Sequence, residues 1–438
     1  MFIELYLRTS DVKSDYYLGK EVSLRGWIHR IRKQKENSFL LLRDDRGGVI
    51  QSIFPSSKTN NLTIESSIEI KGIVHKDTRA PEGGYEIKGT TIYVYSLSKP
   101  DYPLGEYTSP DLLLEYRHLT NRTRKMIMMS KVRSSILRYA RDWFIHNDWY
   151  EVSAPVLVKG SVEGGSTLFK LKYFDDYAFL SQSAQLYLES MIFSLGPVWS
   201  LTPSFRAERS RTVRHLAEFL HLEAEAPWVT LEDLMKIQEK LVLFIIKNTI
   251  KERSHEFDFL KRDISSLEQI SIPFKKMTYE KAIQSLQKKD YHIIDNDVSR
   301  MIEFGDDLNI ESERIITEDS ITPIFITHYP LKIKPFYVKE DPTTADVGLA
   351  VDLLAPYGFG EISSGGIRED NLEKLIRQIH SEGLDSSAYE WYLDLRRYGS
   401  IPHGGFGIGI ERLIRWILNI QDIKDTVPFP RTMSRISP

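Results

Sequence analysis

The hydrophobic pattern of this chain changes its period once along the sequence. Between residues 20 and 96, apolar and polar side chains alternate, as in VSLR at 22–25, and this is the pattern of half-buried strands. From Ser130 onward, apolar residues recur at three- and four-residue spacing, which is the period of an amphipathic helix. A turn-rich segment at 99–105 separates the two regions. The 438 residues are therefore predicted to form two domains and a linker, with bounds 1–98, 99–128 (linker) and 129–438.

The alternating region contains about five short strands separated by turns that carry glycine and proline, which favours a small closed barrel. An oligonucleotide-binding barrel has this strand count. Residues 20–46 hold eight Lys and Arg against four acids, although the whole chain has a net charge of −3. Basic grooves with aromatic faces bind single-stranded nucleic acid, so Trp27, His29 and Phe39 are candidates for base stacking. Gln51 could meet a base edge, and the alternative is a solvated face over core aromatics.

The segment 201–225, LTPSFRAERSRTVRHLAEFLHLEAE, is predicted to form two strands joined by a charged loop. Strand side chains repeat every two residues, so Arg206 and Glu208 are expected to share one face at the end of the first strand. Such a pair could hold two parts of one ligand, whereas the alternative is a solvated hairpin with surface ion pairs. The loop adds Arg209, Arg211 and Arg214.

Two acids and a run of glycines distinguish the last third of the chain. Asp352 and Glu361 lie in strand-like stretches and are the hard oxygen ligands that hold magnesium beside phosphates. The stretch 403–409 has glycines at alternate positions, which let a flat ligand or another backbone approach a strand, and it leads into a helix that carries Arg412. Neither the Gly-Lys-[Ser/Thr] of a Walker loop nor a G-x-G-x-x-G within a βαβ unit is present.

Composition excludes several classes of protein. The hydrophobic fraction of 41% and the charged fraction of 27% are those of an ordinary globular chain, and no apolar run approaches the length of a membrane span. The absence of cysteine excludes disulfides and thiolate sites. The first residues, MFIELYLRTSDVKSD, lack the basic and apolar regions of a secretory signal, so a cytoplasmic location without a membrane partner is expected.

Three elements of the chain resemble, in their order, the signature motifs of class II aminoacyl-tRNA synthetases. They are a long helix with a strand that ends at Pro155, a Phe-Arg-x-Glu strand–loop–strand and a Gly-x-Gly-x-Glu-Arg strand–helix, at about 130–155, 201–225 and 403–417. The preceding barrel extends the resemblance to the subclass of the lysyl, aspartyl and asparaginyl enzymes. This resemblance implies an α+β fold, in which an OB-type barrel precedes an antiparallel sheet flanked by helices, and a homodimer built on the first motif.

The resemblance also implies a reaction and its ligands. The carboxylate of an amino acid attacks the α-phosphate of ATP with the assistance of Mg²⁺, pyrophosphate leaves, and the adenylate is passed to the 3′ end of tRNA. This chemistry builds charge on phosphoryl oxygens and needs no protein nucleophile, so catalysis is expected to rest on positioning and on cationic groups. The implied catalytic residues are Arg206, on the α-phosphate and the substrate carboxylate, and Arg412, on the γ-phosphate.

The remaining site residues are implied by matching positions in the motifs. Those for ATP are Arg206, Glu208, Phe219, Glu361, Gly405, Gly407, Gly409 and Arg412, with the glycines presenting bare backbone to adenine. Those for Mg²⁺ are Asp352 and Glu361. Those for the α-ammonium group are Glu163 and Gln185. Those for tRNA are Arg209, Arg211 and Arg214 at the acceptor end and Arg32, Phe39 and Gln51 at the anticodon.

Three positions bear on which amino acid is activated. Where this chain has Leu188, aspartyl enzymes usually carry a lysine that meets the substrate carboxylate, and where it has Glu223 they usually carry Asp. A buried carboxylate without its cation is costly, so the loss of the lysine favours a neutral side chain. Glu223 can accept from an amide NH₂, and Arg368 can donate to the amide oxygen. The implied substrates are therefore L-asparagine and tRNA(Asn).

Three alternatives stay open on the sequence. An aspartyl enzyme, including one that charges both tRNAs, would be expected to keep the lysine and the Asp. A synthetase-derived asparagine synthetase typically lacks the barrel. A non-catalytic RNA-binding paralogue would be expected to lose at least one of five residues that this chain retains, namely Arg206, Glu208, Asp352, Glu361 and Arg412. Nothing in the stretch 255–320 indicates a role.

Overall fold

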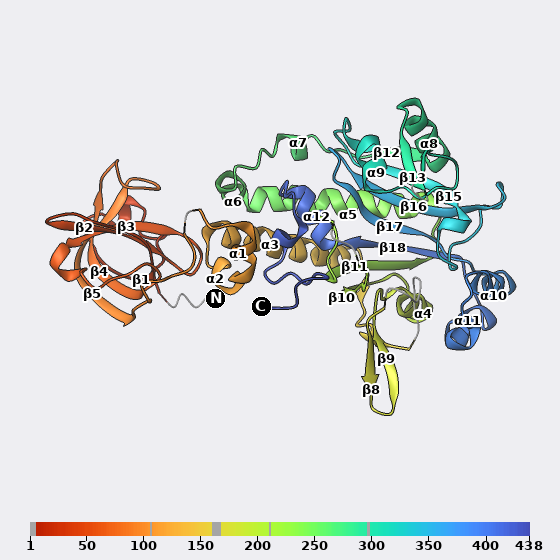
Figure 1. Ribbon diagram of the computed structural model, residues 1–438, viewed down its shortest axis with the longest axis horizontal. Helices are drawn as coiled ribbons and strands as arrows, with labels where there is room; N and C mark the ends of the chain where they lie inside the picture. The colour runs from red at the N-terminus through yellow and green to blue at the C-terminus, as the bar shows by residue number, and fades with distance from the viewer. Residues whose placement is uncertain (1–5, 106, 160–167, 210–211, 296–297) are drawn as a thin grey trace. The chain divides into compact units, whose positions relative to one another are not determined.

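The computed structural model describes residues 6–105, 107–159, 168–209, 212–295 and 298–438 (Figure 1). The chain divides into two compact units, Met1–Met128 and Met129–Ser437. Among the described residues, no helix combines the length and the apolar character that crossing a membrane requires.

The first unit is built around a closed barrel of five strands, which confirms the prediction from the alternating pattern. Neighbouring strands follow the order β1-β2-β3-β5-β4, in which β3 and β5 are parallel and the other pairs are antiparallel. Because side chains alternate along each strand, one set points inward, and Leu24, Ile28 and Leu40 are buried there. The strands are β1 (Glu21–Lys33), β2 (Asn37–Arg43), β3 (Val49–Pro55), β4 (Ser67–Lys76) and β5 (Tyr85–Ser96).

Helices follow the barrel in the stretch that the turn signals mark as a linker. Two of them are short, α1 (Pro110–Glu115) and α2 (Arg117–Thr120). Ser109 caps α1 by accepting from the N–H of Leu112, and Pro110 takes the first helical position, where its missing N–H costs nothing. The long helix α3 (Arg124–His146) then contains the helical pattern seen in the sequence.

The second unit contains a sheet of eight strands in the order β12-β15-β16-β17-β18-β11-β10-β6. The strands from β15 to β10 in this order are antiparallel, whereas the edge strands β12 and β6 pair in parallel with their neighbours. An antiparallel catalytic sheet is what the motifs imply. The strands are β6 (Tyr150–Glu151), β10 (Val198–Phe205), β11 (Glu218–Pro227), β12 (Lys275–Thr278), β15 (Ile324–Pro330), β16 (Val347–Ala355), β17 (Gly360–Ile367) and β18 (His403–Gly409).

Helices flank this sheet (Figure 1). Helix α5 (Leu231–Glu252) packs against β16, β17 and β18, where the hydroxyl of Ser363 donates to Gln238 Oε1 at 2.8 Å. The other helices are α4 (Gln185–Leu195), α6 (Ser254–Phe259), α7 (Ser265–Glu268), α8 (Tyr279–Lys288), α9 (Ile310–Thr317), α10 (Leu372–Ser381), α11 (Glu390–Arg397) and α12 (Ile410–Ile417). Two small sheets consist of β7 (Leu157–Val158), β9 (Asp176–Leu180) and β8 (Lys170–Tyr173), and of β13 (His292–Asp295) and β14 (Val298–Met301).

The N-terminus of α5 is a capping box. Thr230 Oγ1 accepts from the N–H of Asp233 at 3.2 Å, and Asp233 Oδ2 accepts from the N–H of Thr230 at 3.0 Å. We expect Thr230→Ala to lower the free energy of unfolding by about 1 kcal/mol, because it leaves one helix N–H without its acceptor. Urea unfolding measures this change. Thr230→Ser keeps the hydroxyl and should unfold like the wild type, and equal stability of the alanine variant would contradict the role of the cap.

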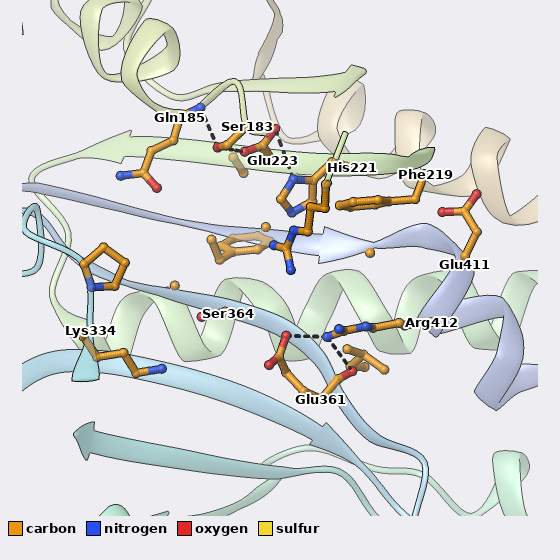
Figure 2. Close-up of a pocket in the computed structure, with 18 of the residues that line it drawn as sticks. Ser183, Gln185, Phe219, His221, Glu223, Lys334, Glu361, Ser364, Glu411 and Arg412 are labelled. Atoms are coloured by element: carbon orange, nitrogen blue, oxygen red, sulfur yellow. Dashed lines mark hydrogen bonds and ion pairs between the residues drawn. The ribbon is translucent and has the colours of Figure 1, made fainter. Parts of the chain in front are cut away.

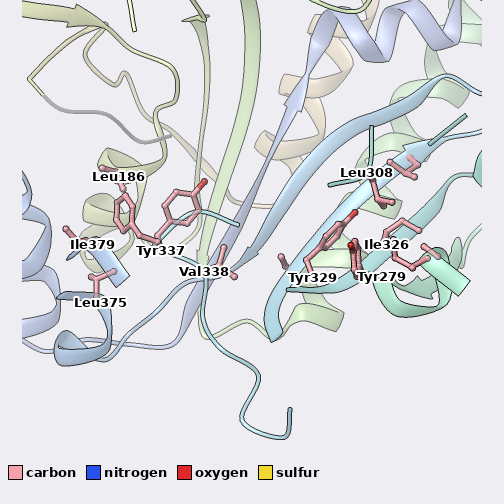
Figure 3. Packing of buried hydrophobic residues seen from close by; sticks show 14 of the residues in the cluster. Leu186, Tyr279, Leu308, Ile326, Tyr329, Tyr337, Val338, Leu375 and Ile379 are labelled. Carbon is pink, nitrogen blue, oxygen red and sulfur yellow. The ribbon is translucent and has the colours of Figure 1, made fainter. Parts of the chain in front are cut away.

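The stretch 255–320 completes a hydrophobic core beside the sheet (Figure 3). The ring centre of Tyr279, on α8, lies 5.1 Å from that of Tyr329, on β15, and both residues are buried with Ile326. This core supports β15 and its neighbour β16, which carries Asp352. The buried residues that this stretch adds to the core, from Tyr279 to Leu308, therefore pack against strands of the sheet.

Candidate active site

A pocket of about 360 Å³ lies against the sheet of the second unit, over β11, β17 and β18 (Figure 2). Ser363 bonds to α5 while the next residue, Ser364, lines the pocket, so the pocket and α5 lie on opposite faces of the sheet. The predicted site residues that line it are Gln185, Leu188, Arg206, Arg214, Phe219, Glu223, Glu361, Arg368, Gly407, Gly409 and Arg412. Residues far apart in the sequence thus meet in one cavity.

The other residues predicted for catalysis and acceptor binding fall into two groups. Those that are described but do not line this pocket are Glu208, Arg209, Asp352 and Gly405. Those outside the described residues are Glu163 and Arg211. Contacts of this second pair with the α-ammonium group and the tRNA acceptor end stay predictions.

The first strand of the Phe-Arg-x-Glu hairpin is shorter than expected. Strand β10 ends at Phe205, so Arg206 and Glu208 lie in the following loop and not on one face of a strand. The backbone N–H of Arg206 donates to Ala217 O at 3.0 Å, which anchors this residue where the loop begins. The guanidinium of Arg206 lies 5.4 Å from the centre of the Phe219 ring. The cation is therefore placed beside the ring that is predicted to stack on adenine.

Alternate residues of β11 face the pocket because strand side chains repeat every two positions. They are Phe219, His221, Glu223 and Glu225. A Cβ at Gly405, on the neighbouring β18, would lie 2.0 Å from Glu225 Oε2, and a Cβ at Gly407 would lie 2.3 Å from His221 Nε2. These two glycines make room for side chains of β11, and their contact with adenine stays a prediction.

One end of the pocket brings several cations close to Glu361 (Figure 2). Arg412 Nη1 donates to Glu361 Oε1 at 2.7 Å. Burial raises the pKa of Glu361, but the charges of Arg412 and Lys334 outweigh it and hold the pKa below its usual value. Arg206 and Arg214 act in the same direction. Cations gathered at one end of a pocket suit a ligand with more than one phosphate group, because each phosphate oxygen accepts charge-assisted hydrogen bonds.

Arg214 was expected at the tRNA acceptor end and is instead buried at this end of the pocket. Its Nη2 lies 2.8 Å from Oε2 of Glu313, on α9. A Cβ at Gly360, where φ is +74°, would lie 2.7 Å from Arg214 Nη1, so glycine leaves room for the guanidinium. This placement corrects the prediction: Arg214 belongs with the cations around Glu361, whereas Arg209 is exposed in the loop.

A β-bulge in β17 turns Glu361 toward the pocket. Asp352 pairs with Ser364 and Leu354 pairs with Glu361, so Ile362 is an extra residue in the register. Directly paired residues of antiparallel strands point to one face, and so do alternate residues of one strand. Glu361 and Ser364 therefore share the face of Asp352, although three residues of separation in a regular strand would place them on opposite faces.

The residues at this end fit a magnesium ion. Asp352 Oδ2 accepts from Lys334 Nζ at 2.7 Å, whereas its Oδ1 is buried and makes no hydrogen bond to any described residue. A buried carboxylate oxygen in this position is costly unless a donor or a cation meets it. Ser364 adds an exposed hydroxyl on the same face. Sequence reasoning missed this serine because a lone serine carries no signal of a ligand.

The other end of the pocket holds a buried arginine–carboxylate pair. Arg368 donates through Nε to Glu225 Oε1 at 3.1 Å and through Nη2 to Glu225 Oε2 at 2.9 Å. Their side chains are 4% and 1% exposed. Burial raises the pKa of Glu225, and the charge of Arg368 opposes this shift. A donor and an acceptor side by side match the two ends of a carboxamide group.

Glu223 holds the turn that leads into α4. It accepts from the hydroxyl of Ser183 and, at 2.8 Å, from the N–H of Ala184. Glu223 also lines the pocket and its contact with an amide stays a prediction, whereas the acceptor that stands beside Arg368 is Glu225. The sequence could have indicated Glu225, because it follows Glu223 by two residues on one strand and such residues share a face.

Helix α4 supplies two more predicted residues at this end. Leu188 is fully buried and packs with Ile192 and Val198. Gln185 Nε2 donates to Glu189 Oε1 at 3.0 Å. The position at which aspartyl enzymes carry a lysine is therefore an apolar contact in this protein.

The three residues predicted to meet an anticodon lie on one face of the barrel. Arg32 pairs with Phe39, and Leu41, two residues further on, pairs with Gln51, so the three side chains point the same way. Arg32 lies over the Phe39 ring, 4.7 Å from its centre, and Gln51 Nε2 donates to Glu86 at 2.9 Å. Recognition of an anticodon by this face stays a prediction.

Known proteins resemble both units of the chain. Residues 109–433 match the family described as tRNA synthetases class II (D, K and N), and residues 22–95 match the OB-fold nucleic acid binding domain. The asparagine–tRNA ligase of Thermococcus gammatolerans is 46% identical over 436 residues, which are 98% of this chain and 98% of that protein. The crystal structure of asparaginyl-tRNA synthetase from Pyrococcus horikoshii, complexed with asparaginyl-adenylate, is 45% identical with a TM-score of 0.93 over 100% of both chains. The structure of asparaginyl-tRNA synthetase from Entamoeba histolytica in complex with asparaginyl-adenylate is 34% identical with a TM-score of 0.89 over 100% of both chains.

Proposed function

Because the chain belongs to the class II aminoacyl-tRNA synthetases of the aspartyl, lysyl and asparaginyl group, we propose that it is an asparagine–tRNA ligase. It activates L-asparagine with ATP to asparaginyl-adenylate and transfers the asparaginyl group to tRNA(Asn). The choice of asparagine as the amino acid rests on the Arg368–Glu225 pair at the end of the pocket. The same pocket has Leu188 where aspartyl enzymes usually carry a lysine. The full-length relatives support asparagine over aspartate. The barrel counts against a synthetase-derived asparagine synthetase.

The cationic end of the pocket suits the triphosphate of ATP. Arg206 neutralises the α-phosphate, where the carboxylate of asparagine attacks and charge builds on the phosphoryl oxygens. Arg412 and Arg214 bind the phosphates that leave as pyrophosphate. The oxygen ligands available to Mg²⁺, which when bound neutralises the departing phosphates, are Asp352, Glu361 and Ser364.

The opposite end distinguishes an amide from a carboxylate. Arg368 donates to the amide oxygen of asparagine, and Glu225 accepts from the amide NH₂. Aspartate would bring a second carboxylate against Glu225, and like charges at a desolvated contact cost several kcal/mol. Gln185, which lines the same end, meets the α-ammonium group.

The same proposal includes contacts that rest on the resemblance. The barrel face with Arg32, Phe39 and Gln51 binds the anticodon, supported by the shared direction of these side chains. Arg209 and Arg211 in the hairpin loop meet the acceptor end. The protein acts as a homodimer built on the first motif and works in the cytoplasm.

The deciding experiment is amino-acid-dependent exchange between ATP and radiolabelled pyrophosphate. Asparagine and aspartate are assayed in parallel with one enzyme preparation, and a reaction without amino acid gives the background. We expect exchange with asparagine to be faster by a factor of roughly 10⁴, since a site that hydrogen-bonds a polar group rejects an analogue that leaves its groups unpaired. Faster exchange with aspartate would contradict the proposal.

Leu188→Lys is expected to lower kcat/KM for asparagine at least about tenfold. The new ammonium group would be buried beside the amide-binding pair or would displace the apolar cluster of α4, and either outcome carries a desolvation cost of several kcal/mol. Pyrophosphate exchange measures the loss. Leu188→Met keeps the volume and the apolar character, so it serves as the control. Unchanged asparagine kinetics in the lysine variant would show that Leu188 does not line the amino-acid site.

A further inference from the structure

A cluster of buried polar side chains lies directly behind the Arg368–Glu225 pair. At its centre is Glu189, on α4, which is fully buried, as are the side chains of Arg396, on α11, and His403, on β18. One oxygen of Glu189, Oε2, lies 2.7 Å from Arg396 Nη2 and 3.0 Å from His403 Nε2. Elements from distant parts of the chain therefore converge on one carboxylate.

The second oxygen of Glu189 faces two residues that line the pocket. Oε1 accepts from Gln185 Nε2 at 3.0 Å and lies 4.0 Å from Arg368 Nε. Tyr392 holds the carboxylate from the far side by donating its hydroxyl to Oε2 at 2.7 Å. Glu189 is not among the residues that line the pocket, yet it contacts both of these.

The cluster pairs two guanidinium groups with two carboxylates, and His403 adds two ring nitrogens that both face acceptors, Ile401 O at 2.7 Å and Glu189 Oε2 at 3.0 Å. Arg368 faces Glu225, and Arg396 faces Glu189. Burial raises the pKa of Glu189, but Arg396 and His403 outweigh it and hold the pKa well below its usual value, so this carboxyl stays charged. Glu189, Glu225 and His403 offer ligand atoms within 4.8 Å of one another, as in a metal site. The two arginines already supply the positive charge that an ion would bring.

We propose that Glu189 is a positioning residue that determines specificity, because its negative charge offsets part of the positive charge of Arg368, Arg396 and His403 and so weakens the attraction of this cluster for the carboxylate of aspartate. This inference rests on the proposed function, whose amino-acid site it concerns. The side chain of asparagine adds no charge to the cluster. The side chain of aspartate adds a negative charge beside the carboxylates of Glu189 and Glu225, and like charges in a buried site are costly. Discrimination between asparagine and aspartate thus depends on a residue that does not line the pocket, in addition to the leucine, in place of lysine, at position 188.

Glu189→Gln tests the proposal, since it removes one charge with little change in shape and keeps an oxygen acceptor for Arg396. The kcat/KM values for asparagine and aspartate are measured by pyrophosphate exchange in one preparation. The ratio of the two values does not depend on the fraction of folded enzyme, so it can be compared with the wild-type ratio even if the variant is less stable. We expect the asparagine/aspartate ratio to fall at least about tenfold. An unchanged ratio, with both values lowered alike, would overturn the proposal and leave Glu189 a structural residue.

Two further variants separate charge from packing. Tyr392→Phe removes a hydrogen bond from the same carboxylate oxygen but keeps the charge, so its asparagine/aspartate ratio should equal that of the wild type. Glu189→Gln combined with Arg396→Gln removes one negative and one positive charge, so the net charge of the cluster equals that of the wild type and the ratio should return toward the wild-type value. A ratio that stays low in the double variant, or that falls in Tyr392→Phe, would overturn the explanation by charge.

The wild type distinguishes failure of this inference from failure of the proposed function. Exchange that depends on asparagine in the wild type, together with an unchanged ratio in Glu189→Gln, rejects the role of Glu189 alone. Absence of exchange with asparagine in the wild type rejects the proposed function and this inference with it.

Discussion

Replacing Arg206 with glutamine is expected to lower kcat/KM for asparagine-dependent pyrophosphate exchange by roughly 10²- to 10³-fold. The guanidinium is held beside the ring of Phe219 within the pocket, where the α-phosphate of ATP is proposed to react. Its charge acts on oxygens that become more negative in the transition state, so the loss should appear in kcat as well as in kcat/KM. Steady-state exchange kinetics at several asparagine and ATP concentrations measure both constants.

Arg209 provides a matched variant from the same loop. It is exposed and does not line the pocket, so Arg209→Gln should leave pyrophosphate exchange unchanged and lower only the transfer to tRNA. Urea unfolding of both variants checks that the fold is kept, with changes within about 1 kcal/mol expected for loop residues. Equal exchange kinetics in Arg206→Gln and the wild type would remove Arg206 from the catalytic site.

Replacing Arg368 with glutamine is expected to have two large effects. Activation of asparagine should fall by at least roughly 10³-fold, because the amide oxygen loses its donor and Glu225 stays buried without its cation. The free energy of unfolding should fall by about 3–5 kcal/mol, the cost of breaking a buried ion pair from one side. Pyrophosphate exchange and urea unfolding measure the two effects separately.

A double variant separates the role of Arg368 in asparagine recognition from its role in the stability of the fold. Arg368→Gln combined with Glu225→Gln removes both charges of the pair, so much of the lost stability should return while asparagine activation stays low. Recovery of both properties would show that the pair matters only for the fold. A stable Arg368→Gln variant that activates asparagine normally would exclude the arginine from the amino-acid site.

Local patterns in the sequence predicted the barrel, the strand–loop–strand at 201–225 and the glycine-rich strand that leads to Arg412, and the structure contains all three. These elements depend on the spacing of apolar residues and on turn residues, which neighbours along the chain determine. Arg206 and Glu361 were candidates from their residue types and positions, the family resemblance added Arg368, and these residues line one pocket. The boundary of β10 at Phe205 was missed because strand ends depend on the partner strand more than on the residues themselves.

What the sequence by itself determined is the order of the elements and the chemical groups available to the site. Only the tertiary structure decided where those groups point. The bulge at Ile362 aims Glu361, Arg214 turns inward to Glu313, and Arg368 is paired with Glu225. Each outcome depends on strands and helices from distant parts of the chain. A buried charged side chain adopts the orientation in which it reaches a hydrogen-bonding partner, and these elements supply the partner.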